Sequence, residues 1–327
     1  MSELGMNSNN QTIKQSNNYL VWLEWPEKCF RIDAQTLRML EGAVRAKNGR
    51  VIRVRSERAF LKALPEATHA LVWNFKAEWF AKAPRLKVLA TPAAGQEFVP
   101  TKGPEGVKIH FGHYHGMLIA ESVLGFMLCW AKGFFAVRNA PAACRAWPRT
   151  WLSDKCYSVG GTKAVIVGYG NVGRAIGREL EKLHVQVTGI TRHGIYRGVS
   201  KLSCENADRF LHEADWLILA LPSTTGTDNI LDAALIRKLP RKCVVINVGR
   251  GNSVDERALY KALKTKRLAG AYLDVRKHEP SATVLESSGY VPELADLPNC
   301  IVMPHASAFS PNYLLHCLWE MWDDGCL

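Results

Sequence analysis

Short runs of apolar, β-branched residues alternate along most of this chain with longer segments in which apolar side chains recur every three or four positions. The first pattern is typical of buried parallel strands, and the second of helices with one buried face. In the second half of the chain we predict strands over 163–167, 185–191, 216–222, 243–248 and 271–275. A helix that begins with an acidic residue is expected over 255–263. Strands separated by helices of this length predict an α/β fold with a Rossmann-type, doubly wound parallel sheet.

The first third of the chain shows the same alternation in a smaller unit. Strands are expected over 20–23, 51–54, 70–73 and 88–91, and helices over 36–46, from Gly116 to about Val137, and over 313–322. We therefore predict two domains, a smaller flavodoxin-like α/β domain and a Rossmann domain. The smaller domain is expected over 19–114 and 305–327, so that the last helix returns to it, and the Rossmann domain over 115–304. Residues 1–18 are polar and are expected to be a disordered leader.

A glycine-rich turn follows the predicted strand 163–167 and precedes a predicted helix. Gly168 allows a tight turn, Gly170 allows a pyrophosphate to approach the backbone, and Gly173 allows the helix and strand to pack closely. A turn of this kind also occurs without a ligand, but the strand before it and the helix after it favour a dinucleotide site. The predicted cofactor contacts in this turn are Gly168, Tyr169, Gly170, Asn171, Val172 and Gly173.

The residues after the next strand indicate which dinucleotide binds. An acidic residue at the end of this strand would bind the ribose hydroxyls of NAD, but Thr191 and Arg192 stand there. A guanidinium binds a 2′-phosphate through two hydrogen bonds, whereas a carboxylate repels it. The sequence therefore favours NADP, with NAD possible, and the alternative is that Arg192 is only a solvated loop residue.

Three polar residues that follow in order supply the chemistry of a dehydrogenase. Histidine suits proton transfer near neutral pH, and His305 is the candidate acid and base. Glu279 would orient its ring and favour the imidazolium, and Arg250 would bind a substrate carboxylate and polarise a keto oxygen. The alternative for each of the three is a surface salt bridge or a capped loop.

Several ordered motifs resemble the D-isomer-specific 2-hydroxyacid dehydrogenase family. They are Ala93-Ala94-Gly95, the segment 246–251, Asp255-Glu256, the segment 273–275 with Glu279-Pro280, and Pro304-His305. The resemblance runs from about Leu71 to His305. It implies that the smaller domain binds substrate, that the substrate is a D-2-hydroxy or 2-oxo acid, and that the protein is a homodimer.

The resemblance also implies roles for particular residues. The main-chain N–H groups near Ala94 and Gly95 would bind the substrate carboxylate together with Arg250, and Asp274 would approach the nicotinamide amide. His305 would contact the substrate as its acid and base. The remaining predicted cofactor contacts are Thr191, Arg192, Leu221, Pro222, Val248, Gly249, Arg250 and His305. The expected activity is NADP-preferring reduction of a small 2-oxo acid such as glyoxylate or hydroxypyruvate. The alternatives are an NAD-preferring phosphoglycerate-type dehydrogenase and a dinucleotide sensor or corepressor.

Composition excludes several other classes of function. The net charge of +12, from 42 basic and 30 acidic residues, is dispersed and accompanies no nucleic-acid motif, so no nucleic-acid partner is expected. No apolar run approaches the roughly 20 residues that span a bilayer, so no membrane association is expected. Nine cysteines without a close motif favour the cytoplasm. His110, His113 and His115 have no acidic or thiolate partner nearby in the sequence, so no metal site is expected.

Overall fold

The chain folds into two compact units in the computed structural model, which describes residues 17–95, 97–144, 146–191, 194–197, 200–202, 207–279 and 294–327. The first unit runs to Gly112 and includes Pro311–Leu327, and the second is His113–Ser310. His305 therefore belongs to the second unit, although the sequence assigned it to the first domain. Most of the expected leader lies outside the described residues. Asn18, at its predicted end, is instead the buried first residue of a strand.

The first unit contains a five-stranded sheet in which every pairing is parallel. Its strands are β1 (Asn18–Trp22), β2 (Arg50–Arg53), β3 (His69–Val72), β4 (Val88–Thr91) and β5 (Lys108–Phe111). Their order, β2-β1-β3-β4-β5, is that of flavodoxin-like folds. The predicted flavodoxin-like fold is thus confirmed, with β5 as a strand that the sequence pattern did not reveal.

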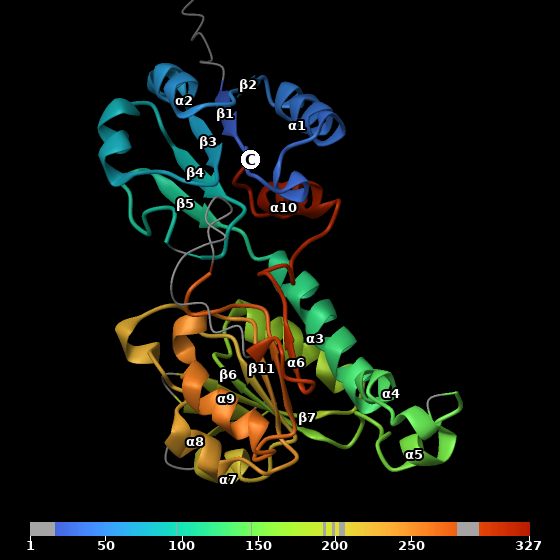
Figure 1. Cartoon of the computed structure of the whole chain (residues 1–327). Helices are drawn as coiled ribbons and strands as arrows, with labels where there is room; N and C mark the ends of the chain where they lie inside the picture. Colours follow the sequence, from blue (N-terminus) through green and yellow to red (C-terminus); the bar gives the residue numbers. More distant parts are fainter. Residues whose placement is uncertain are drawn as a thin grey trace, which may run out of the picture. The chain divides into compact units, whose positions relative to one another are not determined.

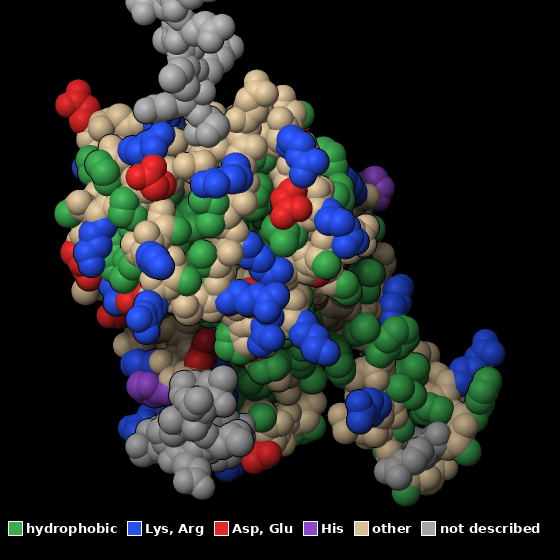
Figure 2. Space-filling model, turned by 90° about the horizontal axis from the view of Figure 1, so that it is seen from above, with side chains coloured by type: hydrophobic (Ala, Val, Ile, Leu, Met, Phe, Trp, Pro, Cys, Tyr) green, Lys and Arg blue, Asp and Glu red, His purple; other side chains and the backbone are tan. Residues whose placement is uncertain are grey.

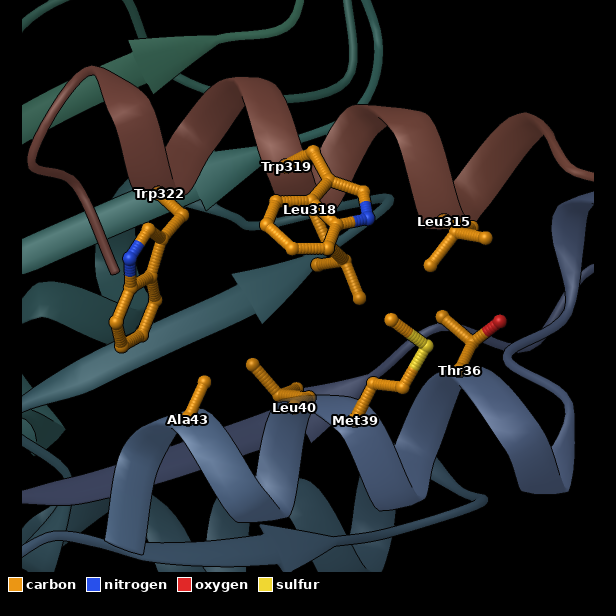
Figure 3. Close-up of a pocket in the computed structure, with 8 residues that line it drawn as sticks. All are labelled: Thr36, Met39, Leu40, Ala43, Leu315, Leu318, Trp319 and Trp322. Carbon is orange, nitrogen blue, oxygen red and sulfur yellow. The ribbon is translucent and has the colours of Figure 1, made fainter. Parts of the chain in front are cut away.

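The helices of the first unit are α1 (Ala34–Ala46), α2 (Glu57–Ala63) and α10 (Tyr313–Asp323), with short 3-10 turns η1 (Lys28–Phe30), η2 (Leu64–Glu66) and η3 (Ala77–Lys82). Helix α1 begins where the Asp33 side chain accepts a hydrogen bond from the Thr36 N–H at 2.7 Å. A hollow of about 220 Å³ between α1 and α10 is drawn in Figure 3. It is lined by Thr36, Met39, Leu40, Ala43, Leu315, Leu318, Trp319 and Trp322. No side chain in this list titrates, so the hollow has no groups for acid–base chemistry.

The second unit contains an eight-stranded sheet in the order β13-β12-β11-β10-β6-β7-β8-β9. Its strands are β6 (Lys163–Val167), β7 (Gln186–Thr191), β8 (Gly194–Arg197), β9 (Ser200–Leu202), β10 (Trp216–Leu219), β11 (Val244–Asn247), β12 (Gly270–Leu273) and β13 (Cys300–Val302). The pairings are parallel from β13 to β7, whereas β8 and β9 add an antiparallel hairpin. Chain order reverses between β6 and β10, which is where ligands of doubly wound sheets bind.

Helices cover both faces of this sheet (Figure 1). They are α3 (His115–Ala131), α4 (Phe134–Arg138), α5 (Arg149–Ser153), α6 (Asn171–Lys182), α7 (Ala207–Leu211), α8 (Ala233–Lys238) and α9 (Glu256–Lys264), with short turns η4 (Ala142–Cys144), η6 (Thr225–Thr227) and η7 (Gly251–Ser253). Side chains of α3 and α6 form one core with alternate strand residues such as Ile166 and Ile218. Side chains of α8 and α9 form a second core with the intervening residues, among them Val165 and Leu217. Burial on both faces explains the continuous apolar runs of the strands.

One predicted helix is divided into two. The expected helix from Gly116 to Val137 breaks after Ala131, and α4 begins at Phe134. Gly133 between them has a φ of 71°, a left-handed conformation that ends a helix and that glycine adopts most easily. The apolar pattern continues through the break, so periodicity alone did not reveal it.

Helix hydrophobicity, surface charge and the state of the cysteines bear on the expected partners and location. Among the described residues, no helix combines the length and the apolar character needed to cross a membrane. Figure 2 shows Lys and Arg side chains spread over the visible face, with acidic and apolar side chains between them. Seven cysteines among the described residues are free thiols.

Candidate active site

The glycine turn after β6 has the geometry that its sequence predicts. Gly168 has a φ of 96°, and a Cβ there would lie 2.5 Å from the carbonyl oxygen of Ala220. A Cβ on Gly173 would overlap the carbonyl of Gly168, so helix α6 packs against the turn only because this residue is glycine. Gly170 precedes the first residue of α6, and nothing lies within 4 Å of where its Cβ would be. Space for a phosphate therefore exists at the positive end of α6.

Tyr169 and Val172 use their side chains for packing. The ring of Tyr169 lies against Gly189 of β7 and Gly177 of α6, where a Cβ would meet the phenolic oxygen at 2.5 Å. Burial in this position raises the pKa of Tyr169. Val172 packs against the core on the α3 and α6 face. Because both side chains pack against neighbouring residues, the predicted cofactor contacts of Tyr169 and Val172 would be made by their main-chain atoms.

The loops after β6, β10 and β11 converge at the carboxyl edge of the sheet. A Cβ on Gly249 would lie 2.5 Å from the Leu221 nitrogen, which shows how closely the loops after β10 and β11 approach. Val248 is buried, and Pro222 is exposed. These predicted cofactor positions thus surround the point where strand order reverses.

Arg250 lies in the loop after β11, with its main chain fixed by neighbours. Its carbonyl oxygen accepts hydrogen bonds from Ser253 Oγ at 2.7 Å and Asn247 Nδ2 at 3.2 Å. One guanidinium nitrogen, Nη1, donates to the Gly249 carbonyl at 2.9 Å. The charge of Arg250 is close enough to lower the pKa of both Glu279 and His305 to some extent. The structure therefore brings the three predicted catalytic residues together.

His305 and Glu279 form a hydrogen-bonded pair. His305 Nδ1 lies 3.0 Å from Glu279 Oε2. This hydrogen bond is the largest influence on His305 and raises its pKa above the ordinary value, against the effect of burial. For Glu279, burial opposes ionisation, but the hydrogen bond from His305 and the neighbouring charges outweigh it and lower the pKa. The pair therefore favours the protonated form of the imidazole.

Asp274 holds the backbone around His305. It is 3% exposed, and its Oδ1 accepts hydrogen bonds from the N–H groups of Ala306 at 3.0 Å and Ser307 at 3.1 Å. Burial raises the pKa of Asp274, partly offset by these hydrogen bonds. Tyr272 supports the same segment, since its hydroxyl lies 2.8 Å from Ser307 Oγ. The resemblance predicted a nicotinamide contact for Asp274, and the structure adds this structural role.

A buried ion pair that the sequence did not predict supports the Glu279 segment. Arg276 donates through Nε and Nη2 to the two oxygens of Glu256 at 2.8 and 3.0 Å, and Glu256 also accepts from the Lys277 N–H at 2.9 Å. Burial opposes ionisation of Glu256, but these bonds outweigh it and lower its pKa. The Arg276 N–H donates to Glu279 Oε1 at 3.3 Å. Gly251 touches the Arg276 main chain so closely that a Cβ would overlap it.

The remaining predicted positions lie on other segments of the chain or outside the described residues. Thr191 is the partly buried last residue of β7. Arg192 and Pro280 lie outside the described residues. In the first unit, Ala94 is exposed and Gly95 is half-buried in the segment that follows β4.

Two of the three histidines considered in the sequence, His115 and His110, lie in different environments. His115 is the buried first residue of α3 in the second unit. His110 lies on β5 in the first unit, and the structure brings Glu320 and Asp324 of the last helix to it. The sequence argument against a metal site, which rested on the lack of nearby acidic partners, therefore fails for His110.

Comparison with known proteins defines the family. The family described as D-isomer specific 2-hydroxyacid dehydrogenase, NAD binding domain, matches residues 124–307, all within the second unit. A glyoxylate reductase from Korarchaeum cryptofilum is 30% identical over 249 residues, which cover 72% of this chain and 70% of the relative. A glycerate dehydrogenase from Methylorubrum extorquens is 29% identical over 245 residues, 71% of this chain and 72% of that protein.

A solved structure is similar over nearly the whole chain. The NADPH-dependent glyoxylate/hydroxypyruvate reductase from Sinorhizobium meliloti, in complex with NADP and sulfate, has a TM-score of 0.71 and 27% identity. The match covers 95% of this chain and 96% of that one. Fold and site define a nicotinamide-dependent dehydrogenase, and the chain belongs to the D-isomer specific 2-hydroxyacid dehydrogenase family. It is an NAD(P)-dependent oxidoreductase of 2-hydroxy and 2-oxo acids, which confirms the predicted family, fold class, enzyme class and cofactor type.

Proposed function

We propose that the chain is an NADPH-preferring reductase that converts glyoxylate, hydroxypyruvate or a similarly small 2-oxo acid to the 2-hydroxy acid. The observation that carries this proposal is the pair His305–Glu279, whose hydrogen bond of 3.0 Å raises the pKa of His305. A hydrogen bond that favours the protonated imidazole suits His305 to donate a proton, and proton donation is what reduction of a keto acid requires. Relatives that are named glyoxylate reductases support the small substrate.

The three residues have separate tasks in this proposal. A bound dinucleotide supplies the hydride for reduction and accepts it for oxidation. His305 donates its proton to the substrate oxygen during reduction and takes it back during oxidation. Glu279 orients the imidazole and stabilises its positive charge. Arg250 binds the substrate carboxylate and polarises the keto oxygen, since a guanidinium presents two parallel donors.

The residues at the carboxyl edge of the large sheet fit a dinucleotide. The pyrophosphate would lie over Gly170, where the space beside the backbone is open at the start of α6. The positions proposed to surround the rest of the cofactor are Leu221, Pro222, Val248, Gly249 and Asp274. We attribute the preference for NADP over NAD to Arg192. This residue follows Thr191 in the sequence, where an NAD enzyme would carry an acidic residue.

The two units have different binding roles in this proposal. We propose that the second unit binds the dinucleotide and the first unit contributes substrate contacts, among them the main-chain N–H groups of Ala94 and Gly95. The match of the NAD binding domain to residues 124–307 supports the first part.

One assay tests the proposed activity directly. Purified chain is mixed with NADPH or NADH and a panel of 2-oxo acids, and loss of absorbance at the nicotinamide band is followed. The panel includes glyoxylate, hydroxypyruvate, pyruvate and a phosphorylated hydroxypyruvate, because relatives named D-3-phosphoglycerate dehydrogenase match part of the chain. Faster turnover of glyoxylate or hydroxypyruvate with NADPH is expected. Tight NADPH binding without turnover of any member would instead indicate a sensor or corepressor.

We also propose a homodimer. In the second unit, α4 and α5 project from the sheet, and Figure 1 shows them away from its strands. Phe134 and Trp147 in this region are 59% and 80% exposed, which is costly for large apolar side chains without a partner. Light scattering should give twice the mass of the chain, and Phe134→Asp with Trp147→Arg should give the mass of one chain. A parent protein that is monomeric at micromolar concentration would contradict the proposal.

We further propose a cytoplasmic location, on the ground of the cysteine content. Seven cysteines among the described residues are free thiols, and free thiols persist best in a reducing compartment. Cell fractionation that recovers the protein outside the cytoplasm would contradict this.

A further inference from the structure

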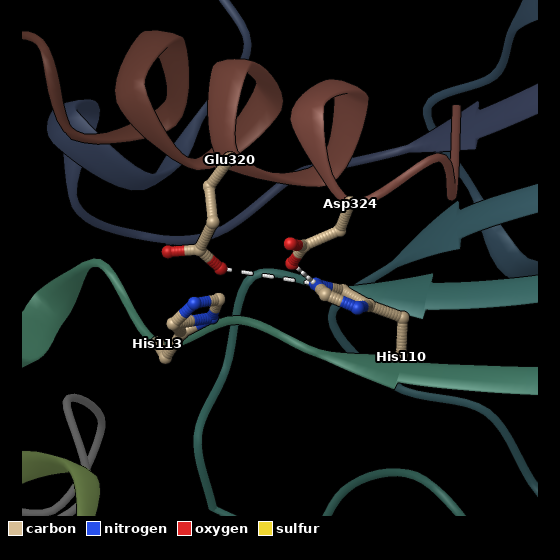
Figure 4. Close-up of side chains that lie close together, drawn as sticks. All are labelled: His110, His113, Glu320 and Asp324. Atoms are coloured by element: carbon tan, nitrogen blue, oxygen red, sulfur yellow. Dashed lines mark ion pairs between the residues drawn. The ribbon is translucent and has the colours of Figure 1, made fainter.

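Three metal-binding side chains meet in the first unit, where β5 ends beside the last turns of α10. His110 Nε2 lies 3.7 Å from Glu320 Oε1 and 3.8 Å from Asp324 Oδ2. Figure 4 shows both carboxylates pointing toward the His110 ring, and it also draws His113, the first residue of the second unit. His110 and Glu320 are only 12% and 13% exposed, and Asp324 is 43% exposed. Two of the three side chains are therefore largely shielded from solvent, and the third is partly accessible.

The distances in this cluster differ from those of a histidine–carboxylate hydrogen bond. In the active site the imidazole of His305 lies 3.0 Å from Glu279. The two distances from His110 exceed the roughly 3.2 Å limit of a good hydrogen bond. They are close to the spacing of about 3.3–3.6 Å between neighbouring ligands around an ion held at about 2.0–2.2 Å. A shared ion explains why one ring nitrogen faces two carboxylates at nearly equal distance.

The charges around the cluster also favour a cation. Glu320 and Asp324 are four residues apart at the end of α10, so they face the same side of the helix and repel each other. They lie at the negative end of the helix dipole, and the last turn of α10 contains no basic residue. A divalent ion would neutralise both carboxylates.

We propose that His110, Glu320 and Asp324 bind a divalent transition-metal ion, with water in the remaining coordination positions. One imidazole and two carboxylates suit Zn²⁺, which takes nitrogen and oxygen ligands in tetrahedral sites. Mg²⁺ and Ca²⁺ prefer oxygen ligands alone, so the imidazole disfavours them.

The ion would tie the C-terminal helix to the edge strand of the sheet. Strand β5 ends at Phe111, directly before Gly112, where the chain leaves the first unit. Because the ion would bind the folded unit and not the unfolded chain, it would raise the stability of the first unit with increasing ion concentration. This role is independent of the reaction proposed above.

The test compares variants of the full chain after chelator treatment and dialysis. The double variant Glu320→Gln with Asp324→Asn keeps the shape of both side chains and removes their charge. Asp323→Asn is the matched control, since it removes a charge from the same helix end outside the cluster. Zn²⁺ affinity is measured by competition with a chromophoric chelator. The parent and the control should bind one Zn²⁺ with equal affinity, and the double variant should bind it at least about 100-fold more weakly, the upper end of the loss for outer-shell changes.

Two further measurements separate this site from the cysteines and the active site. Co²⁺ bound at the cluster should show an absorption spectrum without thiolate charge-transfer bands. Zn²⁺ should raise the melting temperature of the parent and of the control, but not of the double variant. Circular dichroism without metal verifies that the double variant folds. Equal Zn²⁺ affinity of the double variant and the parent, or no specific binding by the parent, would overturn the proposal and leave an ordinary ion pair.

Discussion

The main-chain N–H of His305 donates a hydrogen bond to the carbonyl oxygen of Asp274 at 2.8 Å. The carboxylate of the same aspartate accepts hydrogen bonds from the two residues that follow, Ala306 and Ser307. His305 itself has a φ of 54°, a left-handed conformation that costs energy for a residue other than glycine. Asp274 therefore holds the backbone in the conformation that directs the imidazole toward Glu279.

Replacing Asp274 with alanine should loosen this turn. The N–H groups of Ala306 and Ser307 would lose their acceptor, at a cost of about 1–3 kcal/mol in the free energy of unfolding. Asp274→Asn retains one oxygen acceptor, and it should cost less. Urea unfolding measures the stability of both variants, and kcat should fall more in Asp274→Ala. Equal stability of Asp274→Ala and the parent would show that the turn does not depend on this carboxylate.

Replacing His305 with alanine should separate catalysis from cofactor binding. Loss of a general acid typically reduces the rate by about 10²–10⁴. NADPH affinity should fall far less than kcat, because His305 is only one of the predicted cofactor contacts and the proposed pyrophosphate site at Gly170 is formed by another loop. Steady-state kinetics and fluorescence titration with NADPH measure the two effects. If His305→Ala retains the parent kcat, His305 is not the proton donor.

Replacing Glu279 with glutamine should move the pH profile of reduction. Reduction requires the protonated imidazole, so the rate falls as pH rises through the pKa of His305. Glu279 raises that pKa, chiefly through its hydrogen bond. Glutamine removes the charge, so the pKa should fall and the loss of rate should begin at a lower pH. The measurement is kcat/KM for the 2-oxo acid against pH. An unchanged profile would show that Glu279 has only a structural role.

The sequence predicted best those features that depend on local pattern. The run Trp216–Leu219 is wholly buried because helices cover both faces of the sheet, and such strands are apolar at every position. Asp255 begins α9 as expected, since its carboxylate accepts hydrogen bonds from the N–H groups of Arg257 and Ala258. The glycine turn was predictable because close backbone packing excludes any other residue at Gly173.

Features that depend on contacts between distant residues were not predictable in this way. Glu256 follows the helix cap, and its pairing with Arg276 leaves no trace in the periodicity of either segment. His110 and Glu320 are separated in the sequence by the entire second unit. The hairpin of β8 and β9 is a short antiparallel addition at the edge of a parallel sheet, and its segments are too short for a clear pattern.

The Glu256–Arg276 pair should stabilise the active-site loop. Both side chains are at most 10% exposed, so Glu256→Gln would remove the buried carboxylate that accepts two hydrogen bonds from the Arg276 guanidinium. The expected loss is about 3–5 kcal/mol in the free energy of unfolding. Glu213→Gln is the control, because its ion pair with Lys163 is about half exposed and should contribute at most about 1 kcal/mol.

Kinetics distinguish a positioning role from simple stabilisation. Arg276 contacts Glu279 through its main-chain N–H, so a displaced Arg276 should also displace Glu279. The fall in kcat/KM for reduction with rising pH, which reflects the pKa of His305, should then begin at a lower pH in Glu256→Gln. It should stay unchanged in Glu213→Gln. If Glu256→Gln matches the control in stability and pH profile, the buried pair has no such role.

The preference for NADP should depend on Arg192. Arg192→Asp would replace a phosphate-binding guanidinium with a carboxylate, which repels the 2′-phosphate and can bind the ribose hydroxyls of NAD instead. Loss of one charged hydrogen bond corresponds to about 1–3 kcal/mol, so the ratio of kcat/KM for NADPH over NADH should fall by about 5–150-fold. Arg241→Asp makes the same charge change before β11, at the amino end of that strand, and should leave the ratio unchanged. If Arg192→Asp has the same NADPH-to-NADH ratio of kcat/KM as the parent, Arg192 does not determine the preference and is only a solvated loop residue.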